Sequence, residues 1–524
     1  MEENFEKRTL IAIVLALVVL LGYQYFFAPS PQPRRPEQPR NVAQDIQKRV
    51  TERPSVPKAE NLFVPEGTMA SEERLLKVET PLYTALFSSK GGTIKNWQLK
   101  KYRDDEGLEV VLMRTDAEVP ALAMGTDGKN FVFDKVNFTI SEGQDNINLR
   151  NEGDRASLSF TYRGDGIVIK RTYSFFSDNY DIELIEEVQG PDNYWVTLGT
   201  GFGISGAVGY GGHIGPVILK DADRVEIKPN KLKEPKIFGS ELKWIAQEDK
   251  YFFASLVPLE KAIGAKVWRT GNGDALVAVN LPAGKNKLLL YAGPKEYDRL
   301  KSLGVGLEYI VNFGFFSILA QPLFWILKLF YRAIGNYGWS IALLTILVRI
   351  PFIPLINKGQ KSMKKLQALQ PKMTEIKQKY KKDPQKMQKE MMELYKKYKV
   401  NPMSGCLPML IQIPVFFALY KVLLVAIELR SAPFIFWIQD LSEKDPYYIL
   451  PIIMGATMFI QQKMTPTTME SQQQKIMTYL PIVFTFLFLK FPSGLVLYWL
   501  VSNLLSILQQ YFVNRKIARE EEPV

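Results

Sequence analysis

The chain has 524 residues, 47% of them apolar, with 66 Lys and Arg against 54 Asp and Glu, which gives a net charge of +12. A single Cys excludes a disulfide framework and a cysteine-based zinc site, and the single His, His213, excludes most histidine-dependent metal and catalytic sites. The length allows about three or four soluble domains, or fewer domains plus membrane spans. Long apolar runs at residues 10–27 and from about residue 339 onward favour the second arrangement.

The first predicted element is a membrane anchor over residues 1–28, built on the apolar run 10–27. At about 1.5 Å per residue this run is long enough to cross most of a bilayer core. A cleaved signal peptide is the alternative, but it needs small residues at positions −3 and −1 of the cleavage site. Ala28 suits the second position and Phe26 does not suit the first, so an uncleaved anchor is favoured. The polar, proline-rich residues 29–61 predict a linker.

Residues 62–300 show the pattern of strands separated by turn signals. The segment TALFSSKGGTIKNWQL has two apolar alternations around Gly91-Gly92, and SLSFTYRGDGIVIKRTYSFF repeats this pattern around the Gly-Asp-Gly turn that contains Asp165. Both patterns are typical of β-hairpins. Hairpin signals spread over a region of this length predict a large all-β sandwich domain.

The glycine-rich segment GFGISGAVGYGGHIG lies within this domain, and it has neither the residue order of a phosphate-binding loop nor a following helix pattern. We expect an exposed loop there, with His213 at the surface rather than acting as a ligand. Acidic residues are plentiful over 62–300, so a glycosidase-like carboxylate pair stays open at this stage, although no pattern marks one.

Residues 301–338 are apolar and aromatic, with sparse charges and with Pro322 near the middle. This pattern predicts two short amphipathic helices that lie in the membrane interface. A buried span is the alternative, but an additional crossing would disturb the charge topology that the later spans define.

Five further spans are predicted, and with the anchor they give a multi-pass α-helical membrane protein with six spans. They cover residues 339–356, 403–427, 447–460, 476–489 and 494–513. Two of them, 447–460 and 476–489, fall short of the ~20 residues that a span needs. Short spans imply tilt, local bilayer thinning or shielding by neighbouring helices.

The positive charge is concentrated in residues 357–400, which carry 14 Lys, no Arg and four acidic residues, a net charge of +10. Because the rest of the chain is close to neutral, a diffuse nucleic-acid-binding surface is not expected. The apolar flanks favour a cytoplasmic loop over a merely solvated helix face, since Lys-rich loops stay inside and anionic lipids attract each Lys by about 1 kcal/mol. Both termini are then cytoplasmic, and residues 28–338 are periplasmic.

Within this loop, residues 358–381 and 385–399 predict two helices that form a projecting hairpin, with Asp383 capping the second helix and Pro384 at its first position. The apolar side chains expected to face one another are Leu366, Leu369, Met373, Ile376 and Tyr380 on the first helix and Met387, Met391, Leu394 and Tyr398 on the second. Their methionines suit an adaptable surface.

Arg349 is the most informative residue of the predicted spans, since it lies roughly 10 Å from the inner end of its helix. A charged side chain at the centre of a span costs about 2.5–3.5 kcal/mol on insertion scales, so it normally faces a wet cavity or a partner. No Asp or Glu lies within the other predicted spans. We therefore expect water or a transient guest beside Arg349; an arginine that snorkels to the inner headgroups is the alternative.

Uncharged polar side chains of several spans are predicted to surround Arg349. Thr345 shares its helix face, and Gln412 lies in the span over 403–427. The last span presents a polar stripe at helical spacing, made of Trp499, Asn503, Ser506 and Gln510. Such stripes are often contacts between helices, but here they predict a hydrated, positively charged groove in the inner half of the membrane.

Six stretches carry a resemblance to a known family: YAGPKEYDRL, TILVRIPFIPL, VNPMSGCLPMLIQIPVFFALY, PYYILPIIMGATMFIQQKM, QQKIM and FPSGLVLYWLVSN. Over nearly its full length the chain resembles YidC-type membrane protein insertases of the Gram-negative form. The resemblance implies a periplasmic β-sandwich, an interfacial helix, an insertase core over residues 339–513 with a cytoplasmic hairpin, and a cytoplasmic tail over 514–524. It also implies insertion and folding of inner-membrane proteins, alone or beside the Sec translocon, without enzymatic activity, cofactor or metal.

The resemblance further implies that Arg349 receives polar or acidic client segments in the groove. The full set of predicted client-contact residues is Arg349, Thr345, Gln412, Phe416, Tyr498, Trp499, Asn503 and Ser506. The implied partners are nascent membrane proteins, the Sec translocon, ribosomes or targeting factors at the hairpin, and anionic lipids. Some members carry a long basic tail for ribosome contact, whereas this chain ends in RKIAREEEPV, so docking through the tail is not expected.

Two other functions compete with this interpretation. A solute transporter with Arg349 as an anion site usually shows internal repeats, and none is apparent here. A membrane-anchored enzyme acting on glycans would need catalytic carboxylates within residues 62–300, and its function would be lost if that domain were deleted.

Overall fold

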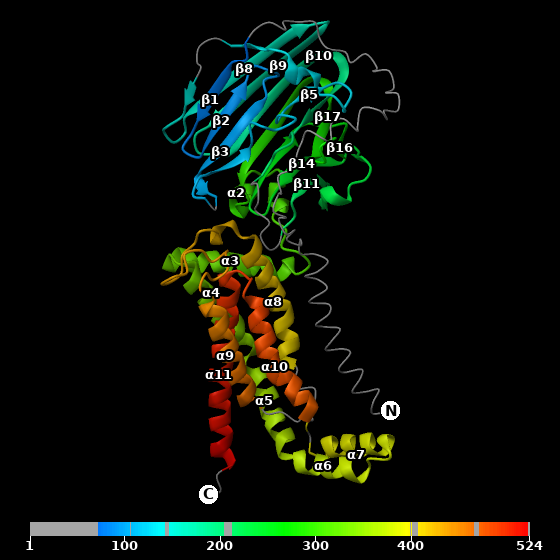
Figure 1. The fold of residues 1–524 in the computed structure, drawn as a ribbon, viewed down its shortest axis with the longest axis vertical. Coiled ribbons are helices and arrows are strands. Elements are labelled where there is room, and N and C mark those ends of the chain that lie inside the picture. The colour runs from blue at the N-terminus through cyan, green and yellow to red at the C-terminus, as the bar shows by residue number, and fades with distance from the viewer. Residues whose placement is uncertain are drawn as a thin grey trace, which may run out of the picture. The chain divides into compact units, whose positions relative to one another are not determined.

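The computed structural model describes residues 72–104, 106–141, 146–203, 212–398, 400, 407–465 and 471–521. The predicted anchor and linker, residues 1–61, lie outside the described residues. The described residues divide into two compact units (Figure 1), a β unit that ends at Val311 and a helical unit that begins at Asn312.

The β unit contains a smaller and a larger sheet (Figure 1). The smaller sheet has the order β4-β3-β2-β1-β7, with strands Leu75–Glu79 (β1), Tyr83–Ser88 (β2), Ile94–Arg103 (β3), Glu109–Met113 (β4) and Asn146–Asn148 (β7). The path through the larger sheet is β12-β11-β14-β15-β17-β10-β9-β8-β6, with β5 attached to β10, and with β16 attached to β17 and β13 to β16. Neighbouring strands pair antiparallel, except that β1 and β7 run parallel.

The strands of the larger sheet are Met124–Gly125 (β5), Thr139–Ile140 (β6), Arg155–Gly164 (β8), Ile167–Phe176 (β9), Asp181–Thr197 (β10), Gly215–Lys220 (β11), Asp223–Glu226 (β12), Lys236–Phe238 (β13), Leu242–Glu248 (β14), Phe252–Pro258 (β15), Gly264–Arg269 (β16) and Ala275–Pro294 (β17). Short 3-10 helices cover Val132–Lys135 (η1) and Pro229–Lys231 (η2).

Both predicted hairpins are confirmed. Strands β2 and β3 pair across the Gly91-Gly92 turn, and β8 and β9 pair in register up to Gly164 opposite Ile167. The two residues between β8 and β9 are Asp165 and Gly166, with φ of 51° and 74°. Positive φ at both positions is what a type I′ hairpin turn requires, and Asp-Gly supplies it at little cost.

Aromatic side chains from both sheets fill the space between them, which confirms the sandwich. The ring of Phe87 on β2 lies 5.0 Å from that of Tyr173 and 5.4 Å from that of Phe175, both on β9. Offset and edge-to-face contacts of this kind stabilise a core beyond the area they bury. The core therefore holds the turn of the β2–β3 hairpin against the larger sheet.

An ion pair lies inside this core. Arg171 on β9 sits directly opposite Glu186 on β10, and both side chains are fully buried. The Nε and Nη2 groups of Arg171 donate to Glu186 Oε1 at 2.9 and 2.7 Å, and Nη1 donates to the carbonyl oxygens of Gly91 and Leu122 at 2.8 and 2.7 Å. Burial opposes the charge, but the neighbouring Tyr173 and Glu186 more than offset it and raise the pKa of Arg171.

The expectation that His213 lies at the surface is wrong. Its side chain is only 9% exposed, and its Nε2 forms a hydrogen bond with the carbonyl oxygen of Pro216 at 3.0 Å. Burial lowers the pKa of the imidazole. Residues 204–211 of the predicted glycine-rich loop lie outside the described residues.

The end of the β unit is fixed by the motif YAGPKEYDRL. The ammonium group of Lys295 donates to Glu248 Oε2 at 2.7 Å and to the carbonyl oxygen of Asp249 at 2.6 Å. The next residue, Glu296, accepts a hydrogen bond from the hydroxyl of Tyr102 at 2.7 Å. Two short helices follow, Tyr297–Ser302 (α2) and Leu307–Ile310 (η3).

The helical unit consists of Ser317–Ile334 (α3), Tyr337–Arg349 (α4), Ile350–Phe352 (η4), Ile353–Ala368 (α5), Gln370–Lys379 (α6), Pro384–Lys397 (α7), Leu407–Val425 (α8), Ile427–Leu429 (η6), Ile449–Met464 (α9), Ser471–Phe488 (α10) and Ser493–Glu521 (α11). Figure 1 shows α4, α8, α9, α10 and α11 side by side as a bundle, which agrees with the packing of α11 against α4 and α9 and of α10 against α9.

The prediction of two short helices before the bundle is wrong, because α3 is a single helix of 18 residues with Pro322 inside it. Proline lacks the N–H that would bond to the carbonyl oxygen of Ile318, so the helix loses this one hydrogen bond in its second turn and still continues. Lys328 of α3 forms an ion pair with Glu428 at 3.7 Å, which ties this helix to the segment after α8.

Two continuous helical stretches among the described residues are long and apolar enough to cross a membrane. They are Tyr337–Ala368, of 32 residues, and Ser493–Lys516, of 24 residues; Gln412–Val425 and Thr478–Phe488 are shorter apolar helices. The first stretch continues past Pro351 and Pro354 through η4, so the predicted span and the hairpin's first helix are one element there. The count of six spans stays a prediction.

The predicted hairpin is present, with one correction. Its first helix is divided at Leu369 into α5 and α6. Asp383 caps α7 as predicted, because its Oδ1 accepts the backbone N–H of Lys386 at 3.1 Å, and Pro384 is the first residue of the helix.

The hairpin core contains part of the predicted set of apolar residues. The buried cluster consists of Leu366, Leu369, Met373 and Val400, with Met363, Met391, Leu394 and Tyr395 packed against it. Tyr398, which we expected in this core, is instead exposed and accepts a hydrogen bond from Lys372.

Candidate polar site in the helical unit

Arg349 ends α4, and its guanidinium is bonded to α11. Its Nε donates to Gln509 Oε1 at 3.2 Å, its Nη1 to the carbonyl oxygen of Ser502 at 3.2 Å, and its Nη2 to the hydroxyl of Ser506 at 2.8 Å. The side chain is partly buried. Because the three acceptors recur at spacings of four and three residues, they lie on one face of α11.

All three acceptors are uncharged. No carboxylate in the described part of the chain lies within ion-pair distance of Arg349, in agreement with the absence of acids from the predicted spans. The positive charge is therefore hydrogen-bonded, but no described residue neutralises it. The contacts to α11 also disfavour the snorkelling alternative, because they direct the head group to a neighbouring helix.

Two members of this network were missed by the sequence prediction. Gln509 Nε2 donates to Asn357 Oδ1 at 2.7 Å and to the carbonyl oxygen of Ile353 at 3.3 Å, so it links Arg349 to α5. A periodicity signal was available, because Gln509 lies one turn after Ser506 and Asn357 about two turns after Arg349.

A second group of predicted residues meets between α8, α10 and α11. Gln412 Nε2 donates to the Tyr498 hydroxyl at 2.6 Å. The ring of Phe416 lies 4.9 Å from that of Trp499 in an edge-to-face contact, and the Trp499 ring lies 5.1 Å from that of Phe488. Tyr498 lies one turn before Ser502 on α11, so the aromatic group is next to the acceptors of Arg349 along this helix.

Thr345 and Asn503 do not take part in either group. The hydroxyl of Thr345 donates to the carbonyl oxygen of Ile341 in its own helix at 2.7 Å and is buried. Asn503 is buried against α9, where its Nδ2 donates to the Thr457 hydroxyl at 3.3 Å.

The predicted stripe on α11 is therefore divided between two neighbours. Ser506 contacts α4, while Asn503 and Gln510 contact α9; Gln510 Nε2 donates to the carbonyl oxygen of Met464 at 2.5 Å. Asn503 and Gln510 therefore form helix–helix contacts with α9, whereas Ser506 belongs to the polar site around Arg349.

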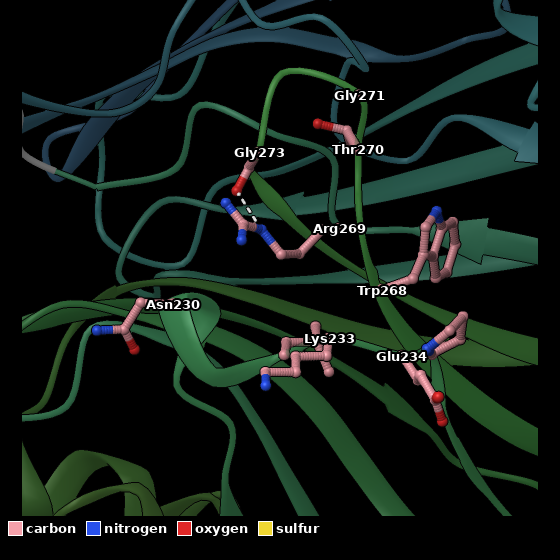
Figure 2. Close-up of a pocket in the computed structure, with 10 residues that line it drawn as sticks. Asn230, Lys233, Glu234, Trp268, Arg269, Thr270, Gly271 and Gly273 are labelled. Carbon is pink, nitrogen blue, oxygen red and sulfur yellow. Dashed lines mark hydrogen bonds between the residues drawn. The ribbon is translucent and has the colours of Figure 1, made fainter.

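The β unit offers an open cleft of about 510 Å³ beside β13 and β16 (Figure 2). Trp268, Arg269 and Lys233 line it, and Arg269 Nε donates to the carbonyl oxygen of Gly273 at 3.0 Å. Glu234 is the one acidic residue of its lining. A glycosidase needs two carboxyl groups across the scissile bond. This cleft therefore does not provide the glycosidase-like carboxylate pair that the sequence left open. No group of three or more potential metal ligands occurs among the described residues.

Fold and site together define a class: an α-helical membrane protein with an attached β-sandwich and a cation among its apolar helices that no described carboxylate pairs with. Residues 329–521 match the family model described as 60Kd inner membrane protein, and residues 75–326 match the model described as YidC periplasmic domain. The proteins named Membrane protein insertase YidC from Geotalea daltonii and Geobacter metallireducens are each 40% identical to this chain, over 540 and 544 residues, covering 98% of it and 99% of each relative. The chain belongs to the YidC family of membrane protein insertases, as the sequence resemblance predicted.

A crystal structure of an active YidC insertase with its first transmembrane domain resolved matches 84% of this chain and 93% of that chain at 20% identity, with a TM-score of 0.39. A galactose mutarotase related enzyme from Lactobacillus acidophilus matches 42% of this chain and 97% of its own at 12% identity, with a TM-score of 0.28. The family itself is one of inner-membrane insertases and not an enzyme class.

Proposed function

We propose that this chain inserts other proteins into the inner membrane, and that it receives their polar segments beside Arg349. The observation that carries the proposal is the guanidinium among apolar helices, whose acceptors in the described part of the chain are all neutral. A carboxylate on an incoming chain is the natural guest of such a charge.

The magnitudes favour a role in moving acidic residues. An Asp at the centre of a span costs about 2.5–3.5 kcal/mol on insertion scales. Two unit charges 4 Å apart at an effective dielectric constant of about 20 attract by roughly 4 kcal/mol. One cation can therefore offset the cost of one acidic residue, provided that no resident carboxylate occupies it.

The aromatic group between α8, α10 and α11 is proposed as the neighbouring contact for the client. Gln412, Phe416, Tyr498 and Trp499 present amide, phenol and ring edges, which suit a segment that passes from polar to apolar surroundings. Ile452 of α9 and Phe486 of α10 are 59% and 69% exposed, as expected for helices that face lipid. Burial of the client's apolar span in lipid would drive its insertion into the membrane.

The Lys-rich hairpin α6–α7 is proposed to lie on the cytoplasmic side, where it would contact anionic lipids and ribosomes or targeting factors. Its charge supports this placement, because residues 357–400 carry a net charge of +10. Cytoplasmic termini, a periplasmic segment 28–338 and cooperation with the Sec translocon belong to the same proposal.

Photo-crosslinking to a stalled nascent membrane protein tests the proposal. A photoreactive residue at Gln412 or Trp499 should label the client, whereas one at Asn503, which faces α9, should not. Failure to label from both sites, together with transport of soluble anions by reconstituted vesicles, would favour the transporter instead.

A further inference from the structure

We infer that Gln509, supported by Asn357, is a positioning residue that sets the orientation of the Arg349 guanidinium toward the client. This inference rests on the proposed function, since it concerns the same polar site. Gln509 uses both ends of its amide: Oε1 accepts from Arg349 Nε at 3.2 Å, and Nε2 donates to Asn357 Oδ1 at 2.7 Å.

The geometry gives Gln509 a distinct part among the three acceptors. Ser502 and Ser506 hold the terminal nitrogens Nη1 and Nη2, whereas Gln509 alone holds Nε, the atom nearest the aliphatic stem. An acceptor on Nε fixes the rotation of the guanidinium about the stem, because the group is planar and rigid. Gln509 is itself held from α5, so α4, α5 and α11 together define the plane.

This orientation leaves donors for a guest. A guanidinium has five N–H groups, and three of them are used by acceptors in the described residues. One N–H on each terminal nitrogen remains, and each can donate a charge-assisted hydrogen bond to a carboxylate oxygen. Loss of the Nε contact would loosen the orientation of these donors toward the client, because only the contacts with Ser502 and Ser506 would then hold the guanidinium.

The neutrality of Gln509 is as important as its hydrogen bond. Gln509→Glu has nearly the same shape and places a resident carboxylate beside Nε, while Asn357 can turn its amide to donate to the new oxygen. The cation would then be paired within the chain and closed to an acidic guest. Gln509→Leu removes the contact without adding a charge.

The experiment uses the full chain in proteoliposomes and three clients that differ only in the translocated segment, which carries Asp, Asn or Lys. Protease protection measures insertion. We expect Gln509→Glu to lower insertion of the Asp client about tenfold relative to the Asn client, and Gln509→Leu to lower it about threefold. Insertion of the Lys client should not fall in Gln509→Glu, which a merely damaged protein would not achieve.

Gln510→Leu is the matched control, because Gln510 is the adjacent glutamine but contacts α9 rather than Arg349. It should leave the ratio of Asp to Asn client unchanged. Equal losses for all three clients in Gln509→Glu would overturn the positioning role. If Arg349→Ala separates the Asp and Asn clients and Gln509→Glu does not, only the role of Gln509 fails; if Arg349→Ala does not separate them either, the proposed client site fails.

Discussion

Two arginines show how differently the two units treat a charge removed from water. Arg171 in the β unit is fully buried and has its own carboxylate, Glu186, plus two backbone carbonyl oxygens. Arg349 in the helical unit is partly buried and has three neutral acceptors but no carboxylate among the described residues. The charge inside the β unit is neutralised where it lies, whereas the charge in the helical unit is held by neutral groups among the described residues, as the proposed client site requires.

The largest expected effect comes from removing the partner of Arg171. Glu186→Gln keeps the shape of the side chain but leaves a fully buried guanidinium without its counter-ion, which typically costs about 3–5 kcal/mol. The free energy of unfolding of the β unit, followed by denaturant titration of the full chain and by hydrogen exchange in β9 and β10, should fall by that amount.

Glu183→Gln on the same strand is the control, because Glu183 is exposed and should change stability by less than about 0.5 kcal/mol. The double variant Arg171→Met with Glu186→Leu should regain most of the loss, since apolar replacement of a buried pair is often neutral. A loss below about 1 kcal/mol in Glu186→Gln would remove the contrast between the two arginines.

The opposite result is expected for Arg349→Ala. It removes three hydrogen bonds to neutral groups but also the cost of keeping a charge among apolar helices, so the thermal midpoint should change little. Insertion of a client with an acidic translocated segment should fall about tenfold, measured by protease protection. Equal losses for acidic and neutral clients would show that Arg349 acts without its charge.

A smaller effect is expected for Arg349→Lys, which keeps the charge but replaces a fork with a single nitrogen. From sequence alone, a charge would suffice and Lys would retain much activity. The three separate acceptors on α11 lower the activity that we expect of this variant, because one ammonium group cannot reach all of them in the same directions. Acidic clients should be inserted about threefold less well than by the native chain, measured with the same assay.

The sequence predicted the features that depend on neighbouring residues or on a single out-of-place charge. The Asp165-Gly166 turn needed only local backbone chemistry, and Arg349 was conspicuous within an apolar run. The alternation of inward and outward residues along β9 places Arg171 on the inward face of the strand, together with Ile169 and Tyr173. The sequence contained this signal, but the prediction did not use it.

Other features depend on which neighbour a helix face meets, and periodicity does not specify this. Ser506 and Asn503 fall on one face of α11, yet they contact α4 and α9 respectively. Gln509 and Asn357 are uncharged and lie toward the ends of apolar runs, where polar residues are ordinary. Pro322 led to the prediction of two helices where the structure has the single helix α3. Whether a helix tolerates a proline depends on how the helix packs, and the sequence does not specify this.

The smallest predicted effect concerns His213, whose contribution to the stability of the β unit depends on pH, unlike that of the Arg171–Glu186 ion pair. His213 is the only histidine of the chain, and burial lowers its pKa below the ordinary value of 6.5, an effect only partly offset by Glu248. The unfolded chain then binds the proton more tightly than the folded chain. The free energy of unfolding should be greatest above about pH 6.5 and should decrease as the pH falls below it, by at most about 1.4 kcal/mol per pH unit.

Denaturant titrations of the full chain between pH 5 and 8 measure this slope in the β unit. His213→Gln keeps a donor for the carbonyl oxygen of Pro216 and cannot gain a proton, so the slope attributable to His213 should disappear. Glu186→Gln should lower stability at every pH in this range while retaining the slope, because a guanidinium stays protonated throughout. A slope that survives in His213→Gln would assign the pH dependence to another group.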